Sequence, residues 1–252
     1  MGIPARTGIE FSFTEAASPD SADAIFITIL PSFEMLQSHM PICKHCSNYT
    51  EEPKDSKRRS NMKAIAINGS PRKGGNTEFL LKKVLEPISE AGIKTELIQI
   101  GGKQVHGCMA CYKCMGNKDS KCAINTDIVN EFIGKMIESD AIILGSPTYF
   151  AGMTSEMKAL IDRAGFVAVA NGRLFSRKIG AAVVVNRRGG ATSVMDSINH
   201  MFLMSRMIVP GSTYWNFGVG REKGDVEKDV EALENMKDLG ETIAWLVKRL
   251  KK

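Results

Sequence analysis

The chain has 252 residues, of which 43% are hydrophobic and 24% charged, and its formal net charge is +5. This composition allows one large domain, or one domain with an extension, to bury a sizeable core. The sequence predicts no membrane-spanning helix, because no apolar run approaches the roughly 20 residues that such a helix needs. The acidic N-terminal residues lack the basic start of a signal peptide, and no stripe of Lys and Arg interleaved with aromatic residues indicates nucleic-acid binding. We therefore expect a cytoplasmic protein with neither a membrane nor a nucleic-acid partner.

Residues 1–61 differ from the rest of the chain. They hold six basic and eight acidic residues and end in the polar run TEEPKDSKRRSN. Two interpretations stay open: a disordered or poorly ordered extension, or a segment that is not translated because translation begins at Met62. Cys43 and Cys46 form a single CxxC near His39, and we expect incidental cysteines there, because a zinc site normally needs a second ligand pair.

Strands and helices alternate along residues 62–252, which we predict to form one domain. Apolar runs indicate the strands, and apolar residues at helical spacing indicate the helices. The predicted elements alternate between strand and helix and start with a strand, and the cysteine-rich segment lies between the second strand and the helix after it. In chain order they are Lys63–Asn68, Thr77–Ala91, Lys94–Ile100, Asp127–Ser139, Ala141–Gly145, Thr154–Ala164, Lys178–Val185, Ala191–Met204, Met207–Tyr214 and Asp225–Lys251. This order predicts an α/β fold with a doubly wound, five-stranded parallel sheet between two helical layers. In such a sheet, ligands bind outside the carboxyl ends of the strands.

The loop after the first predicted strand, NGSPRKGGNTEF, is rich in glycine and hydroxyl side chains. It leads into a helix, whose N-terminal N–H groups and dipole favour an anion. The side chains of Ser70, Arg72, Asn76 and Thr77 suit one phosphate monoester, and glycines such as Gly74 let the backbone approach it. The alternative is an ordinary glycine-rich turn that caps the helix. The loop lacks the lysine of a nucleoside triphosphatase loop, which argues against ATP.

The loops after the third and fourth predicted strands offer a flat wall and positive charge. In SPTYFAG, Pro147, Tyr149 and Phe150 are suited to a planar aromatic ligand, although the two aromatic residues could instead belong to the core. In NRRGGA, Arg187 and the glycines could approach the edge of a flavin and stabilise its reduced anion. The alternative for this second loop is a basic surface turn.

Four of the six cysteines lie in the segment GCMACYKCMGNKDSKC, after the second predicted strand. The CxxCxxC spacing lets three thiolates converge on one face of an iron–sulfur cubane, and a more distant cysteine completes the ligand set. The ligands would be Cys108, Cys111, Cys114 and Cys122. A zinc site, redox-active thiols and thiols without any cluster remain alternatives.

The sequences GSPRKGGNT and SPTYFAGMTSEMKALIDR, together with the glycine-rich NRRGGA loop, resemble the NAD(P)H-dependent FMN reductase branch of the flavodoxin-like proteins. The four-cysteine motif is similar to that of the iron–sulfur flavoproteins. The resemblance covers Met62 to about Lys252 and implies a flavodoxin-like fold with strand order 2-1-3-4-5 and non-covalently bound FMN. By position, the phosphate would be held by Ser70, Arg72, Gly74, Asn76 and Thr77, the ring bordered by Pro147, Thr148, Tyr149, Phe150 and Gly152, and its other edge contacted by Asn186, Arg187, Gly189 and Gly190. The four cysteines would hold a 4Fe-4S cluster.

The expected function is that of an FMN-dependent oxidoreductase or electron-transfer flavoprotein, reduced by NAD(P)H or by a ferredoxin-type donor. We expect no catalytic acid or base from the protein, because the cofactor does the chemistry. The resemblance also implies a homodimer or homotetramer. The alternative function is that of a redox- or metal-responsive flavin-binding protein without steady turnover.

Overall fold

The computed structural model describes residues 62–251. The predictions for residues 1–61, including those for Cys43 and Cys46, lie outside the described residues. No helix within residues 62–251 combines the length and apolar character that crossing a bilayer requires.

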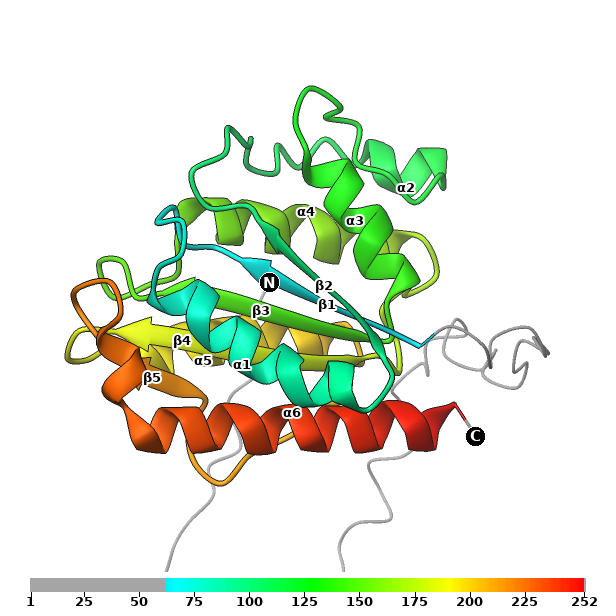
Figure 1. Ribbon diagram of the computed structural model, residues 1–252. Coiled ribbons are helices and arrows are strands. Elements are labelled where there is room, and N and C mark those ends of the chain that lie inside the picture. Colours follow the sequence, from blue (N-terminus) through cyan, green and yellow to red (C-terminus); the bar gives the residue numbers. More distant parts are fainter. Residues whose placement is uncertain (1–61, 252) are drawn as a thin grey trace, which may run out of the picture. The chain divides into compact units, whose positions relative to one another are not determined.

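A five-stranded sheet forms the middle layer of the domain (Figure 1). All neighbouring strands pair in parallel, and their spatial order is β2-β1-β3-β4-β5. This confirms the expected topology. The strands are β1 (Lys63–Asn68), β2 (Lys94–Gln99), β3 (Ala141–Pro147), β4 (Ile179–Asn186) and β5 (Phe217–Val219).

Helices cover both faces of the sheet, and alternate side chains of β1 pack into the two cores on these opposite faces. Ala64 and Ala66 belong to the core that includes α1 and α6, which run side by side in Figure 1. Ile65 and Ile67 belong to the opposite core, with α3, α4 and α5. Successive strand residues point to opposite faces, so the central strands are apolar on both sides. The helices are α1 (Asn76–Glu90), α2 (Lys113–Asn117), α3 (Val129–Glu138), α4 (Ser155–Ala170), α5 (Ala191–Met204), the 3-10 helix η3 (Asp225–Lys228) and α6 (Val230–Leu250).

The predicted fifth strand, Met207–Tyr214, is wrong. Ile208 makes only an isolated bridge to Ile179, and Pro210, which has no N–H to donate to a sheet, follows two residues later. Pairing with β4 resumes where the amide of Val184 donates to the carbonyl of Asn216, and β5 follows. The strand that completes the sheet is therefore short and lies further along the chain.

Two helices differ from their predicted bounds by more than two residues. Helix α4 continues through Gly165 to Ala170, because apolar residues keep facing the core beyond the predicted end. Helix α6 begins only at Val230, where the side chain of Asp229 accepts a hydrogen bond from the amide of Ala232 and caps the helix. The preceding turn forms η3 instead.

Candidate cofactor site and cysteine segment

A pocket of about 200 Å³ lies at the carboxyl ends of β1, β3 and β4. It brings together nine of the residues predicted from the sequence: Ser70, Arg72, Asn76, Thr77, Pro147, Thr148, Tyr149, Asn186 and Arg187. Of the other predicted residues, Gly74, Phe150, Gly152, Gly189 and Gly190 are not among the lining residues. The three loops chosen from the sequence thus meet at one place.

The loop after β1 is folded by its own polar groups. The side chain of Asn68 accepts a hydrogen bond from the amide of Ser70 at 2.9 Å, and the hydroxyl of Ser70 accepts one from the amide of Arg72 at 3.3 Å. Helix α1 then begins after Gly75, and no side chain caps it. The first N–H groups of a helix have no partner inside the helix, so this uncapped end is suited to an anion.

Gly74 shapes the turn that leads into α1. Its φ is +60°, a left-handed conformation that glycine adopts without strain. Its amide donates to the carboxylate of Glu78 at 2.6 Å. Gly74 therefore supports the loop from outside the pocket.

A fourth loop, Gly220–Lys223, completes the pocket and was not predicted. Its residues Gly220, Arg221 and Lys223 line the pocket. Asn76 holds this loop: its amide group donates to the carbonyl of Glu222 at 2.8 Å and accepts from the amide of Gly224 at 2.8 Å. The guanidinium of Arg72 also donates to the carbonyl of Arg221 at 3.0 Å. The signal for this loop is the sequence VGREKG, which lies beyond the end of the predicted last strand, Met207–Tyr214.

The loop after β3 forms a tight, exposed hairpin. Tyr149 and Gly152 exchange two backbone hydrogen bonds, of 2.7 and 2.9 Å. Phe150 and Ala151 between them have φ of +45° and +65°, and the side chain of Phe150 is fully exposed. Tyr149 is 46% exposed, so the alternative that these two aromatic residues belong to the core is wrong.

Two buried polar atoms at the pocket have no hydrogen-bond partner: Oγ1 of Thr148 and Oδ1 of Asn186. Buried polar atoms are nearly always paired in folded proteins, so these two indicate a ligand that carries hydrogen-bond donors. The lining includes four cationic side chains and no carboxylate. A ligand with an anionic group and polar N–H or O–H groups fits this set, as FMN does.

Gly190 lies behind Thr148, at the start of α5. Its φ is +85°, and a Cβ at this position would lie 3.0 Å from Cγ2 of Thr148. Glycine therefore allows the loops after β3 and β4 to pack closely. Gly189 has open space around it.

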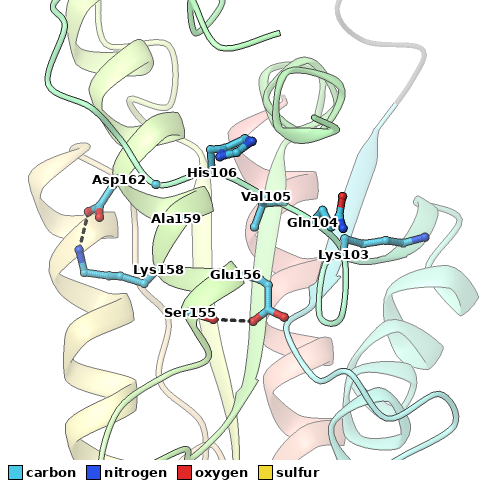
Figure 2. Close-up of a pocket in the computed structure, with 10 residues that line it drawn as sticks. Lys103, Gln104, Val105, His106, Ser155, Glu156, Lys158, Ala159 and Asp162 are labelled. Atoms are coloured by element: carbon cyan, nitrogen blue, oxygen red, sulfur yellow. Dashed lines mark hydrogen bonds and ion pairs between the residues drawn. The ribbon is translucent and has the colours of Figure 1, made fainter. Parts of the chain in front are cut away.

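A second, more open groove of about 760 Å³ lies beside the cysteine segment. Figure 2 shows Lys103 to His106 running along the first turns of α4, with Glu156, Lys158 and Asp162 on the helix side. Lys158 and Asp162 form an ion pair, and Ser155 donates to Glu156. The groove is lined by charges of both signs, unlike the cofactor pocket.

The cysteine segment places its four thiols in different surroundings. Cys108 and Cys111 are exposed, Cys114 is buried and Cys122 is partly buried, and all four are free. Burial raises the pKa of the Cys114 thiol, and electrostatic interactions with Cys122, Cys111 and Cys108 raise it further. Within residues 62–251, no group of three His, Cys, Asp or Glu side chains is placed so that it could hold a metal ion.

The segment is anchored by a residue that the sequence analysis did not single out, Arg163 on α4. It forms an ion pair with Asp127, at 2.5 Å, and its Nε donates to the sulfur of Cys122 at 3.2 Å. The available signal was a charged residue between Leu160 and Ala164, on the buried face of a helix.

Comparison with known proteins places this arrangement in a family. Residues 62–222 match the family model described as NADPH-dependent FMN reductase. The chain is 40% identical over 198 residues to an iron–sulfur flavoprotein of Methanocaldococcus jannaschii, covering 76% of this chain and all of that protein. It is 32% identical over 201 residues to an iron–sulfur flavoprotein of Archaeoglobus fulgidus, covering 75% of this chain and 98% of that one.

The fold itself recurs among solved structures. A flavodoxin from the domain Archaea superposes with a TM-score of 0.50 at 20% identity, covering 74% of this chain and 99% of the other. At this identity the likeness supports the fold alone, which is flavodoxin-like. The family match and the two relatives confirm the resemblance stated from the motifs. The chain belongs to the NADPH-dependent FMN reductase family of flavodoxin-like oxidoreductases.

Proposed function

We propose that the protein is an FMN-dependent oxidoreductase or electron-transfer flavoprotein that binds FMN non-covalently in the pocket at the ends of β1, β3 and β4. One observation carries the proposal: Thr148 and Asn186, whose side-chain oxygens are buried and unpaired, line the same pocket as the residues at the uncapped N-terminus of α1. A phosphate at one end of a ligand and donor groups at the other would satisfy both features.

The loops divide the recognition of FMN between them. Ser70, Arg72 and Thr77, with the first amides of α1, hold the phosphate. Asn76 contributes through the loop that it fixes, Gly220–Lys223, whose Lys223 adds positive charge. Gly74 supports this part of the site through its turn.

The ring lies between the other two loops. Pro147, Thr148 and Tyr149 border it on one side, and the hairpin that contains Phe150 and Gly152 extends this wall. Asn186 and Arg187 meet its other edge, next to the backbone of Gly189 and Gly190. A cation at this edge favours a reduced, anionic flavin.

FMN supplies the one- and two-electron redox chemistry when bound, and the chain supplies binding and charge. The lining of the pocket includes neither His nor a carboxylate, and the proposal assigns no role as acid or base to the protein. NAD(P)H or a ferredoxin-type protein is the proposed donor, and the cytoplasm is the proposed location. A homodimer or homotetramer remains part of the proposal.

We further propose that Cys108, Cys111, Cys114 and Cys122 hold a 4Fe-4S cluster. Four thiols on one segment are the donor set that such a cluster requires, and two relatives carry the name iron–sulfur flavoprotein. As the segment stands, no three of these thiols are placed to hold a metal ion, so the exposed Cys108 and Cys111 have to move to complete the set.

The same exposure of Cys108 and Cys111 favours the second candidate, a redox- or metal-responsive flavin-binding protein without steady turnover. The two functions differ in kinetics. Rapid bleaching of the bound flavin by NAD(P)H or by a reduced ferredoxin, sustained over many turnovers with an acceptor, supports the oxidoreductase. A flavin that these donors do not reduce supports the second candidate.

The test of the proposal is anaerobic purification followed by a visible spectrum and assays of flavin, iron and sulfide. We expect one FMN per chain and about four iron and four sulfide, as a 4Fe-4S cluster contains. Flavin without iron would contradict the cluster and leave an FMN reductase. A colourless protein that does not take up FMN would contradict the whole proposal.

A matched pair of variants links the flavin to this pocket. Arg72→Gln removes a lining cation, whereas Lys73→Gln removes the exposed cation of the next residue, which does not line the pocket. A hydrogen bond to a charged group is worth about 1.5 to 3 kcal/mol, so Arg72→Gln should weaken FMN binding roughly tenfold to a hundredfold. Lys73→Gln should leave the affinity almost unchanged.

A further inference from the structure

Arg163 is a buried cation on the apolar face of α4. Only 1% of the residue is exposed, and its neighbours along this face, Leu160, Ala164 and Val167, belong to the hydrophobic core. A buried charge is costly unless it is paired and hydrogen-bonded. The reason for placing an arginine here must therefore lie in its contacts.

The hydrogen bonds and the ion pair of the Arg163 guanidinium all go to the segment that carries the cysteines. Nη1 of Arg163 pairs with Asp127 at 2.5 Å and donates to the carbonyl of His106 at 3.1 Å. Nη2 donates to the carbonyl of Ile124 at 2.8 Å, and Nε donates to the sulfur of Cys122 at 3.2 Å. One guanidinium thus ties both ends of the segment 106–127 to α4. A lysine cannot reproduce this set, because it has no rigid fork of donors.

Asp127 completes the same junction from the other side. Its carboxylate accepts hydrogen bonds from the amides of His106, at 2.9 Å, and Val129, at 3.1 Å. Burial alone would raise the pKa of Asp127, but the hydrogen bond from Arg163 and those two amides outweigh it and lower the pKa. The carboxylate therefore neutralises the charge of Arg163, and the effect of Arg163 on Cys122 comes mainly through the N–H···S hydrogen bond.

The backbone around Cys122 and Cys114 is fixed separately. The side chain of Asn130 holds both the amide and the carbonyl of Cys122, at 2.8 and 2.9 Å. Asn171, just after α4, donates to the carbonyl of Cys114 at 3.4 Å. Asn130 on α3 and Asn171 after α4 thus hold the backbone at these two cysteines. The side chain of Arg163 holds the sulfur atom of Cys122 itself.

We propose that Arg163 is a positioning residue for the redox centre of the cysteine segment. It fixes the sulfur of Cys122, which packs against the same core as the buried Cys114, and its Nε–H raises the reduction potential of the cluster that these sulfurs bind. A hydrogen bond to a ligand sulfur stabilises the extra negative charge of the reduced cluster, and such bonds are among the factors that set cluster potentials. This inference rests on the proposed cluster.

The experiment compares four full-length chains, purified anaerobically: wild type, Arg163→Lys, Asp127→Asn and Lys158→Gln. Lys158 is on the same helix and forms an exposed ion pair with Asp162, so Lys158→Gln is the control. Iron, sulfide and FMN are assayed in each chain, and the midpoint potential of the cluster is measured by a redox titration followed by electron paramagnetic resonance.

The variants are expected to shift the potential in opposite directions. Arg163→Lys keeps a positive charge beside Asp127 but loses the N–H···S bond, so the potential falls; a tenfold change in the reduction equilibrium corresponds to 59 mV for one electron. Asp127→Asn leaves the charge of Arg163 uncompensated, so the potential rises. The control matches wild type. Full cluster content with an unchanged potential in Arg163→Lys overturns the proposal.

A second measurement separates this inference from the proposed cluster. If wild type holds FMN but no iron, the cluster and the effect on its potential both fail, and amide hydrogen exchange then tests positioning alone. Loss of protection confined to residues 106–127 in Arg163→Lys, with β1 and β3 unchanged, supports positioning. Exchange equal to wild type overturns it. If Arg163→Lys does not fold, as judged by FMN content, the cluster potential of Asp127→Asn tests the proposal, because that chain retains Arg163 and its donors. A potential above that of wild type supports the proposal, and a potential equal to that of wild type overturns it.

Discussion

Gly101, which follows β2, lies directly against Ser70 in the loop after β1. A Cβ built on Gly101 would lie 2.3 Å from the carbonyl carbon of Ser70 and 2.4 Å from its oxygen. The amide of Gly101 also donates to the carbonyl of Asn68 at 3.1 Å. The chain that leads from β2 to the cysteines is therefore packed against the backbone of the proposed phosphate loop.

This contact predicts that Gly101→Ala weakens FMN binding as well as stability. The new methyl group would overlap backbone atoms, which cannot turn aside as a side chain can, so the loop of Ser70 has to move. Overpacking typically costs about 1 to 3 kcal/mol. Urea denaturation and titration with FMN measure the two effects. Gly134→Ala in α3 is the control, because a Cβ there meets nothing within 4 Å; equal FMN affinity in both variants would contradict the prediction.

Thr148→Val should weaken FMN binding without destabilising the protein that lacks FMN. The substitution removes Oγ1, which is buried and unpaired in the chain alone, while keeping the shape of the side chain. A hydrogen bond contributes about 1 kcal/mol net, so the affinity should fall roughly fivefold. Thr242→Val, on the distant half of α6, is the control. An unchanged affinity would mean that no donor of FMN pairs with this oxygen.

Asn76→Ala should loosen the loop Gly220–Lys223. Asn76 supplies both hydrogen bonds that tie its side chain to Glu222 and Gly224. At about 1 kcal/mol each, their loss should lower the free energy of unfolding by roughly 2 kcal/mol and raise the rate of amide exchange at Gly224. FMN binding should weaken in parallel, because Lys223 is no longer held at the pocket. Unchanged exchange at Gly224 would show that other contacts hold this loop.

The sequence predicted the central strands and their loops because local patterns specify them. β1, β3 and β4 are apolar on both faces, and the three loops that end them contain the glycines and polar residues that the pocket uses. Helix bounds were less accurate, since η3 packs against α1 and β5, and Asp229 also accepts a hydrogen bond from the amide of Val219 in β5.

The features that were missed depend on residues far apart in the sequence. β5 has only three residues, too few for a period-2 pattern, and its position depends on where β4 offers a partner. The prediction therefore also missed the pocket loop after β5, Gly220–Lys223. Arg163 and Asp127 are 36 residues apart, and nothing in the spacing of either residue indicates the other.

The buried pair also predicts how stability depends on pH. The pKa of Asp127 is lowered in the folded protein, below the ordinary value of about 3.9. Above that value the carboxylate is ionised in both states, and its pairing with Arg163 contributes fully to stability. As the pH falls further, the unfolded chain takes up a proton first, so the contribution falls and is lost once the pH passes the folded pKa.

Asp127→Asn should therefore be less stable than wild type at pH 7, by about 3 to 5 kcal/mol for a broken buried pair. The difference in free energy of unfolding between wild type and Asp127→Asn should become progressively smaller below about pH 4. Asp162→Asn is the matched control, because it breaks the exposed pair with Lys158, which is worth at most about 1 kcal/mol. Urea denaturation at a series of pH values from 7 to about 3 checks both variants. A difference for Asp127→Asn that stays constant across this range would show that Asp127 acts through packing and neutral hydrogen bonds rather than through its charge.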